Sequence, residues 1–437
     1  MTTPRDAFLT TLGKTAVPVN VRTGGFISPT ATPVETPGLL SNAKGLLGVD
    51  ALSAQSTNID RGRRTSIDIT TPSLTTRNLL CLRALLNLAI ALGPTLENAW
   101  LIILEPLRQA DMLMASWTSR NKQSIDQSSA QALNSEVSAA MLAADRLFES
   151  TVDFPNEAFL HMLTALCKLL HDREPQATET RAPAPPSGSQ RHKRRAASSS
   201  SVSFGTEAYE QDYKSPLKRI GSLAHLNLIR LLSYDASESG WDLLINELIA
   251  FVCSDEVAPT ARQAAANTLS GLVKDAVTSD LTESPEQRNN VQCRAFDALL
   301  NEIKGLKKEG DAAQRHHSPT DGDTRIQLDA LSALQATVEQ AGDTLTAGWN
   351  IVLELLLTAF EERDHNVASA GKSSTSSEPI DVDFVSKALG RTAYDTVQLI
   401  CSDFLSSIPN DCFTTLIDLL FRFCKQTDDL NVSLTVC

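Results

Sequence analysis

The sequence predicts an all-α protein, a solenoid of helical hairpins of the HEAT or armadillo type that long disordered linkers interrupt. Three observations predict this fold class. Apolar residues recur at three- and four-residue spacing in block after block, which is typical of amphipathic helices. No stretch of useful length alternates apolar and polar residues as a half-buried strand would. One distinctive helix-pair pattern occurs at two distant places, and such repetition is typical of solenoids.

Length and charge limit the class of protein further. A chain of 437 residues is too long for one compact core, and an extended repeat array accommodates it. Hydrophobic residues make up 42% of the chain but aromatic residues only 5%, and the Leu and Ala content favours helices. The net charge of −13 makes nucleic acid a poor partner, so we expect none.

Cysteine usage and the lack of long apolar runs indicate the compartment. None of the eight cysteines forms a CxxC pair, and most lie within apolar helical patterns, which fits a reducing compartment. The start of the chain lacks the apolar core of a signal peptide. No uninterrupted run of about 18 apolar residues exists, so we expect no transmembrane helix.

The first element should be a short helix over 3–13. Thr3 is a candidate N-cap, Pro4 suits the first helical position, and Gly13 is expected to end the helix. Residues 18–72 are rich in Pro, Gly, Ser and Thr, which predicts a disordered linker.

The next two helices should form a hairpin. The first is expected over about 73–92, where Gly93 and Pro94 stop it. The second is expected to open at Thr95 or Leu96 and to run to about 117, with Pro106 kinking or breaking it. Further helices are predicted over 130–150 and 155–172. In the last of these a buried stripe is expected from Phe159, Met162, Leu163, Leu166 and Leu170.

The remaining helices resume after a second polar stretch. They are expected from about 215 to 307, then over 324–341, 343–363, 381–407 and 410–426. The division that follows is a short helix over 1–17, a linker over 18–72, a helical block over 73–172, a linker over 173–213, a helical block over 214–307, a linker over 308–322, a hairpin over 323–363, a linker over 364–379 and a terminal helical pair over 380–437.

The repeated pattern reads "LGPTLENAWLIILEPL" at 92–107 and "AGDTLTAGWNIVLELL" at 341–356. A shift of 249 residues aligns several identical residues, among them Gly93 with Gly342, Thr95 with Thr344 and Trp100 with Trp349. A looser third copy surrounds Trp241. We expect the glycine to end helix one in a left-handed cap, and the threonine to cap helix two. The tryptophan should lie about one turn into helix two and pack against its partner. Burying one tryptophan removes about 200 Å² from water, an upper bound of roughly 5 kcal/mol.

Catalytic signals are weak, so we predict no catalytic, cofactor-binding or metal site. Phosphate-binding, dinucleotide-binding, nucleophile-elbow and zinc-protease motifs are absent. Cys412 and Cys424 are expected to be core thiols rather than metal ligands. The basic cluster "RHKRR" at 191–195 fits a nuclear localisation signal, a lipid-contacting patch or a solvated part of the linker.

Two stretches suggest a family. "PRDAFLTTLGKTAVP" at 4–18 is followed, after a low-complexity insert, by "TTRNLLCLRALLNLAIALGPTLENAWLIILEPL" at 75–107. This arrangement resembles the Mon-two family of large Golgi and endosomal scaffold proteins, which are related to the Sec-seven Arf exchange factors but lack their catalytic domain. Members are several times longer, so the chain is expected to be an internal piece from the carboxy-terminal half.

The resemblance implies a role in vesicle-mediated protein transport between the trans-Golgi and endosomes, on the cytoplasmic side and peripheral to the membrane. It also implies a Dopey-type protein, an Arf-like GTPase and a phospholipid flippase as partners. No family site residue maps onto this chain. We therefore predict a non-catalytic scaffold. Two alternatives remain: a guanine nucleotide exchange factor for an Arf-like GTPase, and an importin-like transport receptor.

Overall fold

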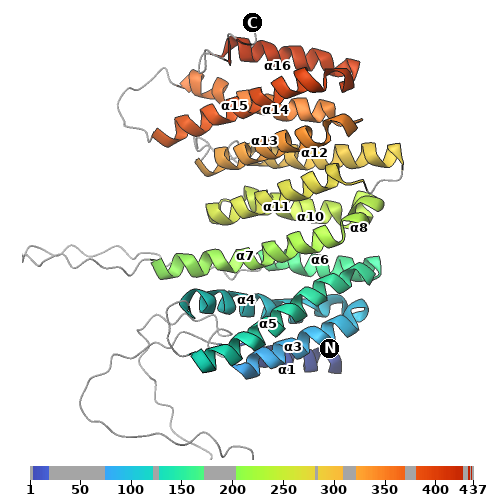
Figure 1. Ribbon diagram of the computed structural model, residues 1–437, viewed down its shortest axis with the longest axis vertical. Helices are drawn as coiled ribbons and strands as arrows, with labels where there is room; N and C mark the ends of the chain where they lie inside the picture. Colours follow the sequence, from blue (N-terminus) through green and yellow to red (C-terminus); the bar gives the residue numbers. More distant parts are fainter. Residues whose placement is uncertain are drawn as a thin grey trace, which may run out of the picture.

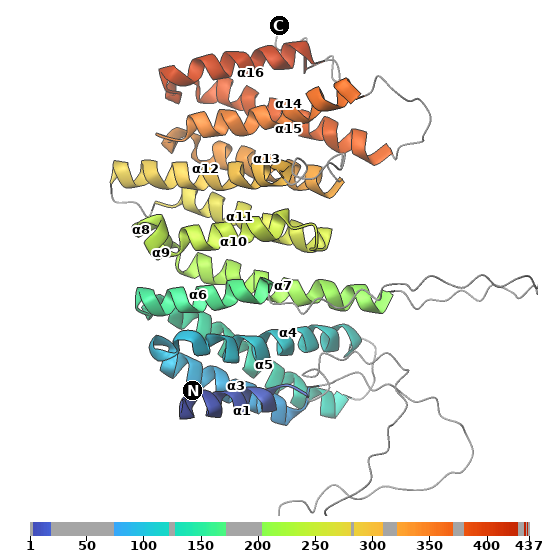
Figure 2. The ribbon, with the colours of Figure 1, turned by 180° about the vertical axis from the view of Figure 1, so that it is seen from behind.

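A computed structural model describes residues 3–18, 74–121, 127–171, 203–280, 284–308, 321–369, 380–426, 432, 433 and 435. Within these ranges the regular structure is helical and no strand occurs, as the sequence predicts. Figures 1 and 2 show an elongated stack of helices, with the two ends of the chain at opposite ends of the stack. The fold is therefore an all-α, solenoid-like array.

The stack has two layers, and each successive hairpin contributes one helix to each layer (Figures 1 and 2). One layer contains α3 (Thr76–Leu92), α5 (Gln127–Ser150), α7 (Ser203–Leu226), α11 (Pro259–Thr278), α13 (Asp321–Ala341) and α15 (Ile380–Asp403). The other contains α4 (Trp100–Asn121), α6 (Asn156–His171), α10 (Trp241–Cys253), α12 (Pro285–Lys308), α14 (Trp349–Ser369) and α16 (Phe413–Lys425). Two short helices, α8 (Leu228–Ser233) and α9 (Ala236–Ser239), occupy the corner between α7 and α10.

Each helix packs on its neighbours in the same layer and, across the layers, on its hairpin partner or on a helix of the adjacent hairpin. The apolar faces between the layers form one continuous core, which runs from Leu9 at one end of the stack to Phe423 at the other. A single hairpin cannot bury both of its faces, so stacking supplies the core. The predicted stripe of α6 is part of this core, and all five of its residues are buried.

The first helix, α1 (Pro4–Ala16), packs on α3 and α4. Thr3 is its N-cap, with its hydroxyl oxygen accepting a hydrogen bond from the Asp6 amide at 3.2 Å. The prediction that Gly13 ends this helix was wrong, because the helix continues to Ala16. A Cβ at Gly13 would lie 3.0 Å from Pro106 Cγ and 3.2 Å from the Ile102 carbonyl oxygen. This glycine therefore allows α1 to approach α4 closely.

Pro106 does not break α4, contrary to one of the two expected outcomes. The helix runs through it from Trp100 to Asn121. A proline has no amide hydrogen to donate to the carbonyl four residues earlier, which here is that of Ile102. Both the proline ring and that carbonyl face Gly13, so the neighbouring helix fills the site of the irregularity.

Several boundaries differ from the prediction. The linker expected over 173–213 was wrong for its last part, because α7 begins at Ser203. The second helix of the late hairpin begins at Trp349 rather than at 343, and it extends to Ser369, into the linker expected over 364–379. The other predicted linkers, together with the basic cluster at 191–195, lie wholly or largely outside the described residues.

By length and composition alone, Thr76–Thr95 could cross a membrane, a test that core helices of soluble proteins also pass. In this fold α3 packs between α1 and α5. Its apolar face is fully buried there through Leu79, Leu82, Leu85, Leu86 and Ala89. This packing is that of a core helix.

Candidate functional site

The two repeat glycines lie where one hairpin corner meets the next hairpin. The expected left-handed cap was wrong: Gly93 has φ −42° and ψ −51°, and Gly342 is not among the described glycines with positive φ. A Cβ at Gly93 would lie 2.2 Å from the ring of Phe154, and one at Gly342 would lie 2.5 Å from the ring of Phe404. Glycine is therefore required by close approach of an aromatic ring and not by backbone conformation.

The two repeat threonines form hydrogen bonds at the C-terminus of the first helix of their hairpin. The prediction that they cap the second helix was wrong. The Thr95 hydroxyl donates to the Leu92 carbonyl at 2.9 Å, and the Thr344 hydroxyl donates to the Ala341 carbonyl at 2.9 Å. In both copies these residues form a 3₁₀ turn directly after the helix, at Gly93–Thr95 and Gly342–Thr344. The threonines thus satisfy carbonyls at a helix C-terminus, which otherwise lack donors.

The three repeat tryptophans occupy one structural position. Trp100, Trp241 and Trp349 are 0%, 3% and 1% exposed. Each is the first residue of its α-helix, so the prediction that they lie one turn into the helix was wrong. From that position each ring contributes to the core at a hairpin corner.

The indole nitrogens of two of these tryptophans differ in their partners. Trp349 Nε1 donates to the Leu345 carbonyl at 3.3 Å. Trp100 Nε1 is buried and has no acceptor among the described residues. The equivalent carbonyl in that corner, that of Leu96, instead accepts from the Ala99 amide at 2.8 Å. A second 3₁₀ turn, Glu97–Ala99, makes this difference.

Phe154 and Phe404 extend the repeat beyond the hairpin. Each follows the first helix of the next hairpin, α5 or α15, and the two are 250 residues apart, against 249 for the glycines. The repeated unit is therefore four helices, α3 to α6 and α13 to α16. Sequence reasoning missed these phenylalanines, and their near-equal spacing from the glycines was the available signal.

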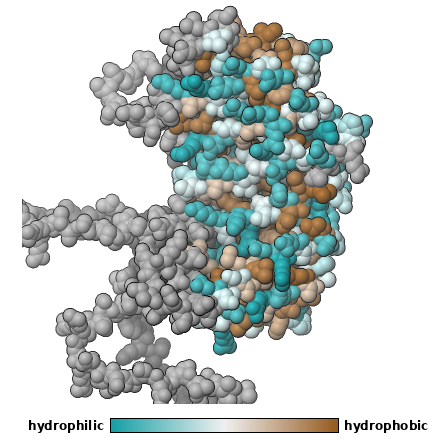
Figure 3. All heavy atoms as spheres, in the orientation of Figure 1, coloured by the Kyte–Doolittle hydropathy of each residue, from teal (hydrophilic) through white to brown (hydrophobic). Residues whose placement is uncertain are grey.

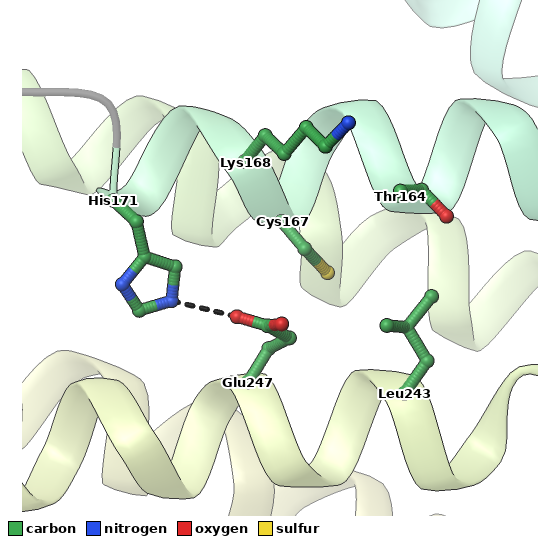
Figure 4. Close-up of a pocket in the computed structure, with 6 residues that line it drawn as sticks. All are labelled: Thr164, Cys167, Lys168, His171, Leu243 and Glu247. Carbon is green, nitrogen blue, oxygen red and sulfur yellow. Dashed lines mark ion pairs between the residues drawn. The ribbon is translucent and has the colours of Figure 1, made fainter.

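A hollow of about 350 Å³ lies between α6 and α10 (Figure 4). His171 Nε2 pairs with a Glu247 carboxylate oxygen at 2.7 Å, and the Cys167 side chain points toward the same carboxylate. Burial, with a smaller contribution from Glu247, raises the pKa of the Cys167 thiol to about 12. A thiol of such high pKa is a poor nucleophile, since the thiolate is the reactive form. Among the described residues no cluster of three or more His, Cys, Asp or Glu could hold a metal ion.

The same ion pair belongs to a helix-docking interface. Gly240 directly precedes α10 with φ +85°, and a Cβ there would lie 2.7 Å from Leu160 Cδ2 and 2.9 Å from Leu163 Cδ2 on α6. The backbone at the start of α10 therefore rests directly on the side chains of Leu160 and Leu163. Eight residues after Leu163, His171 pairs with Glu247 of α10. An apolar contact and an ion pair thus fix the register of the two helices.

The packing of α14 on α12 has the same two contacts, a left-handed glycine against an apolar side chain and a charged pair further along the helices. Gly348 precedes α14 with φ +83°, and a Cβ there would lie 2.9 Å from Phe296 Cδ2 on α12. Eight residues after Phe296, Lys304 Nζ pairs with a Glu354 carboxylate oxygen at 2.6 Å. The glycine lies six residues before its glutamate here and seven residues before it in α10.

Some apolar side chains remain on the surface. Figure 3 shows hydrophobic side chains reaching the visible face in several separate places among hydrophilic ones. The more exposed large apolar residues of the described chain include Phe8, Ile229, Ile417 and Phe421. Two of them, Ile417 and Phe421, lie one turn apart on α16. Clustered exposed apolar residues are candidate contact points for other proteins.

Comparisons with known proteins find similarity over nearly the whole chain. It is 25% identical to "Protein MON2 homolog" of Schizosaccharomyces pombe, over 99% of this chain and 27% of that protein. The proteins of the same name from Xenopus laevis and Homo sapiens are 22% and 21% identical, over 100% of this chain and 22% of each relative. The chain thus spans about a quarter of the length of these curated relatives. No family model and no solved structure matches. The resemblance to the Mon-two family is confirmed by these relatives.

Proposed function

We propose that this chain is a non-catalytic part of an α-solenoid scaffold in vesicle-mediated protein transport between the trans-Golgi and endosomes. It acts by binding other proteins, on the cytoplasmic side and peripheral to the membrane. The observation that carries the proposal is the similarity to MON2 proteins over nearly the full chain. The family resemblance supplies the transport role, and a Dopey-type protein, an Arf-like GTPase and a phospholipid flippase are its proposed partners.

The fold supports a binding role rather than catalysis. The repeat glycines and tryptophans that stand out in the sequence are buried at corners, where they hold hairpins together. The histidine, cysteine and glutamate that meet between α6 and α10 form a packing interface with a thiol of raised pKa. A long two-layered stack offers extended outer faces, and solenoids use such faces for binding.

Reconstitution with purified components tests the proposal. The 437-residue chain is mixed with a Dopey-type protein and run on a sizing column, and it is separately mixed with an Arf-like GTPase loaded with a fluorescent nucleotide. We expect co-elution in the first experiment and unchanged nucleotide release in the second. Failure to bind the Dopey-type protein would overturn the scaffold proposal. Acceleration of nucleotide release would replace it with the exchange-factor alternative.

The location of a fluorescent fusion in cells tests the membrane part of the proposal. We expect the chain on trans-Golgi and endosomal membranes. A variant with Gln at Arg191, Lys193, Arg194 and Arg195 tests the basic cluster. Loss of membrane signal would make the cluster a lipid contact, loss of nuclear signal would make it a localisation signal, and no change would make it a solvated linker. A diffuse wild-type fusion would contradict peripheral membrane binding.

A further inference from the structure

The corner between α7 and α10 presents large apolar side chains to solvent halfway along the stack. Figures 1 and 2 show α8 at one edge, between the α5–α6 hairpin on one side and the α11–α12 hairpin on the other. The exposed side chains form what we call the corner patch: Val152 is 51% exposed, Leu226 38%, Ile229 59% and Tyr234 49%. Because hairpins are in place on both sides, a longer stack at either end would not cover this surface.

Arg230 joins the members of the corner patch into one surface. Its Nη2 donates to the Val152 carbonyl at 2.9 Å, which holds α8 against the 3₁₀ turn that follows α5. Ile229 directly precedes Arg230, and Leu226 lies three residues before Ile229. Burial lowers the pKa of Arg230, and the Tyr234 phenol opposes this shift, so the phenol lies close to the same guanidinium. The four side chains therefore cluster around one arginine.

Several backbone carbonyls of this corner already have donors. Arg230 Nη2 also donates to the Phe154 carbonyl at 2.7 Å. From α12, Arg294 Nη2 donates to the Leu231 carbonyl at 3.0 Å, and a glutamine amide donates to the next carbonyl at 3.3 Å. An extended peptide that binds through main-chain hydrogen bonds would find these acceptors occupied. The corner patch therefore favours a ligand that binds through side chains, as an amphipathic helix does.

The exposed charges around the corner patch are mainly acidic. Within 146–153 and 226–239, Arg146 is the one exposed basic residue, and the exposed acidic residues are Glu149, Asp153, Asp235 and Glu238. Arg230 and Arg294 are bonded to backbone carbonyls, and His225 is paired with Asp275 at 3.0 Å. Asn156 Nδ2 donates to the Glu238 carbonyl at 2.7 Å, which places α9 beside the turn that carries Val152. An acidic rim thus borders the apolar side chains.

We propose that the corner patch docks a basic amphipathic α-helix of a partner protein. Apolar residues of that helix, at three- and four-residue spacing, would pack on Val152, Ile229 and Tyr234. Lysines or arginines on its flanks would face the carboxylates of the acidic rim. The proposal rests on the binding role proposed above but on none of the named partners. Binding of the peptides described below can therefore fail while a Dopey-type protein co-elutes, and the reverse.

Charge favours this occupant over a second copy of the chain and over a membrane. Two copies that met patch to patch would bring two acidic rims together. Anionic lipid headgroups would meet the same carboxylates. The chain's own basic cluster at 191–195 lacks the apolar half of the ligand, because 181–201 contains no Val, Leu, Ile, Met, Phe, Tyr or Trp. A separate helix that is both basic and apolar supplies both features.

Two designed peptides test the proposal. Each is a fluorescein-labelled helix of about five turns, with leucine at three- and four-residue spacing on one face and alanine on the opposite face. The first carries lysine on both flanks, and the second carries glutamate there. Fluorescence anisotropy with the full 437-residue chain should show saturable binding of the lysine peptide and none of the glutamate peptide. Ile229→Ser should weaken binding at least tenfold, whereas the matched control Ile417→Ser, 62% exposed on α16, should leave it unchanged.

A charge exchange separates the acidic rim from the general attraction of an acidic chain for a basic peptide. One variant combines Glu149→Lys, Asp153→Lys and Glu238→Lys. A matched control combines Asp255→Lys, Glu256→Lys and Asp411→Lys, which are also exposed and make the same change in net charge. The rim variant should weaken binding of the lysine peptide at least tenfold and should bind the glutamate peptide, and the control should do neither. Circular dichroism checks that each variant keeps the helicity of the wild type.

Four results would overturn the proposal. The first is a lack of saturable binding of the lysine peptide, and the second is equal weakening by the rim variant and its matched control. The third is a dimer of the wild-type chain that Ile229→Ser dissociates in sedimentation experiments, because a second copy would then be the occupant. The fourth is flotation with phosphatidylserine vesicles that Ile229→Ser abolishes, because the corner patch would then contact lipid.

Discussion

Gly342→Ala tests whether contact with an aromatic ring is the reason that glycine is required at the repeat positions. A Cβ at this position would lie 2.5 Å from Phe404 Cζ and 2.6 Å from both of its Cε atoms. Ordinary contact begins near 3.4 Å, so the ring, which is buried, must shift by roughly 1 Å, and overpacking of this kind costs about 1–3 kcal/mol. Replacing glycine restricts the unfolded chain and returns about 0.4–1 kcal/mol. We expect a net loss of about 1–2 kcal/mol in the free energy of unfolding.

Urea unfolding and hydrogen exchange measure this effect, with two companion variants. Phe404→Leu shortens the side chain that meets the new methyl group, so the double variant should be more stable than the sum of the single effects by at least about 0.5 kcal/mol. Gly271→Ala is the matched control, because its Cβ meets nothing within 4 Å inside α11, and it should stabilise the protein by about 0.5–1 kcal/mol. Loss of hydrogen-exchange protection should centre on α13 to α16. Wild-type stability of Gly342→Ala, or strict additivity with Phe404→Leu, would refute the reasoning.

Three further predictions concern single buried or corner groups. Trp349→Ala should lower the free energy of unfolding by about 3–5 kcal/mol, and a melting temperature within a degree or two of wild type would contradict its core role. Thr344→Val removes the hydroxyl that donates to the Ala341 carbonyl and should cost about 0.5–1.5 kcal/mol by urea unfolding, whereas Thr344→Ser keeps that hydroxyl and serves for comparison. Glu302→Gln should remove a pH dependence of the free energy of unfolding. Burial, with a smaller contribution from Asp329, raises the pKa of Glu302 from 4.5 to about 8. The folded state therefore holds a proton that the unfolded state releases. Wild-type stability should therefore fall by about 1.4 kcal/mol per pH unit between roughly pH 4.5 and 8, relative to the variant, and parallel urea midpoints for the two proteins across that window would contradict it.

The sequence identified the right corner residues but not the reason for them. Gly93 and Gly342 mark helix ends, and the common explanation for a glycine there is a left-handed cap. The ring that actually requires each glycine comes from the next hairpin, about sixty residues further along the chain. Nothing in local propensity pairs positions so far apart. The true left-handed glycines, Gly240 and Gly348, directly precede the tryptophans instead.

Some predictions of where helices begin and end were wrong for a related reason, namely that contacts with other helices decide the boundary. Pro106 predicts a break because a proline removes one backbone hydrogen bond, yet α4 continues where Gly13 of the neighbouring helix packs against the irregularity. The early start of α7 lies in a polar stretch that reads as linker by composition alone. Helix type and apolar faces were predictable because periodicity is local, as the buried stripe of α6 shows. Contacts between hairpins were not predictable because they depend on the stack.

The contacts at the hairpin corners indicate how the stack keeps its shape along its length. Gly93 packs against Phe154 of the following hairpin, and Gly240 rests on Leu160 and Leu163 of the preceding one, so each corner is fixed by its immediate neighbours. Stability is then a sum of hairpin and nearest-neighbour terms.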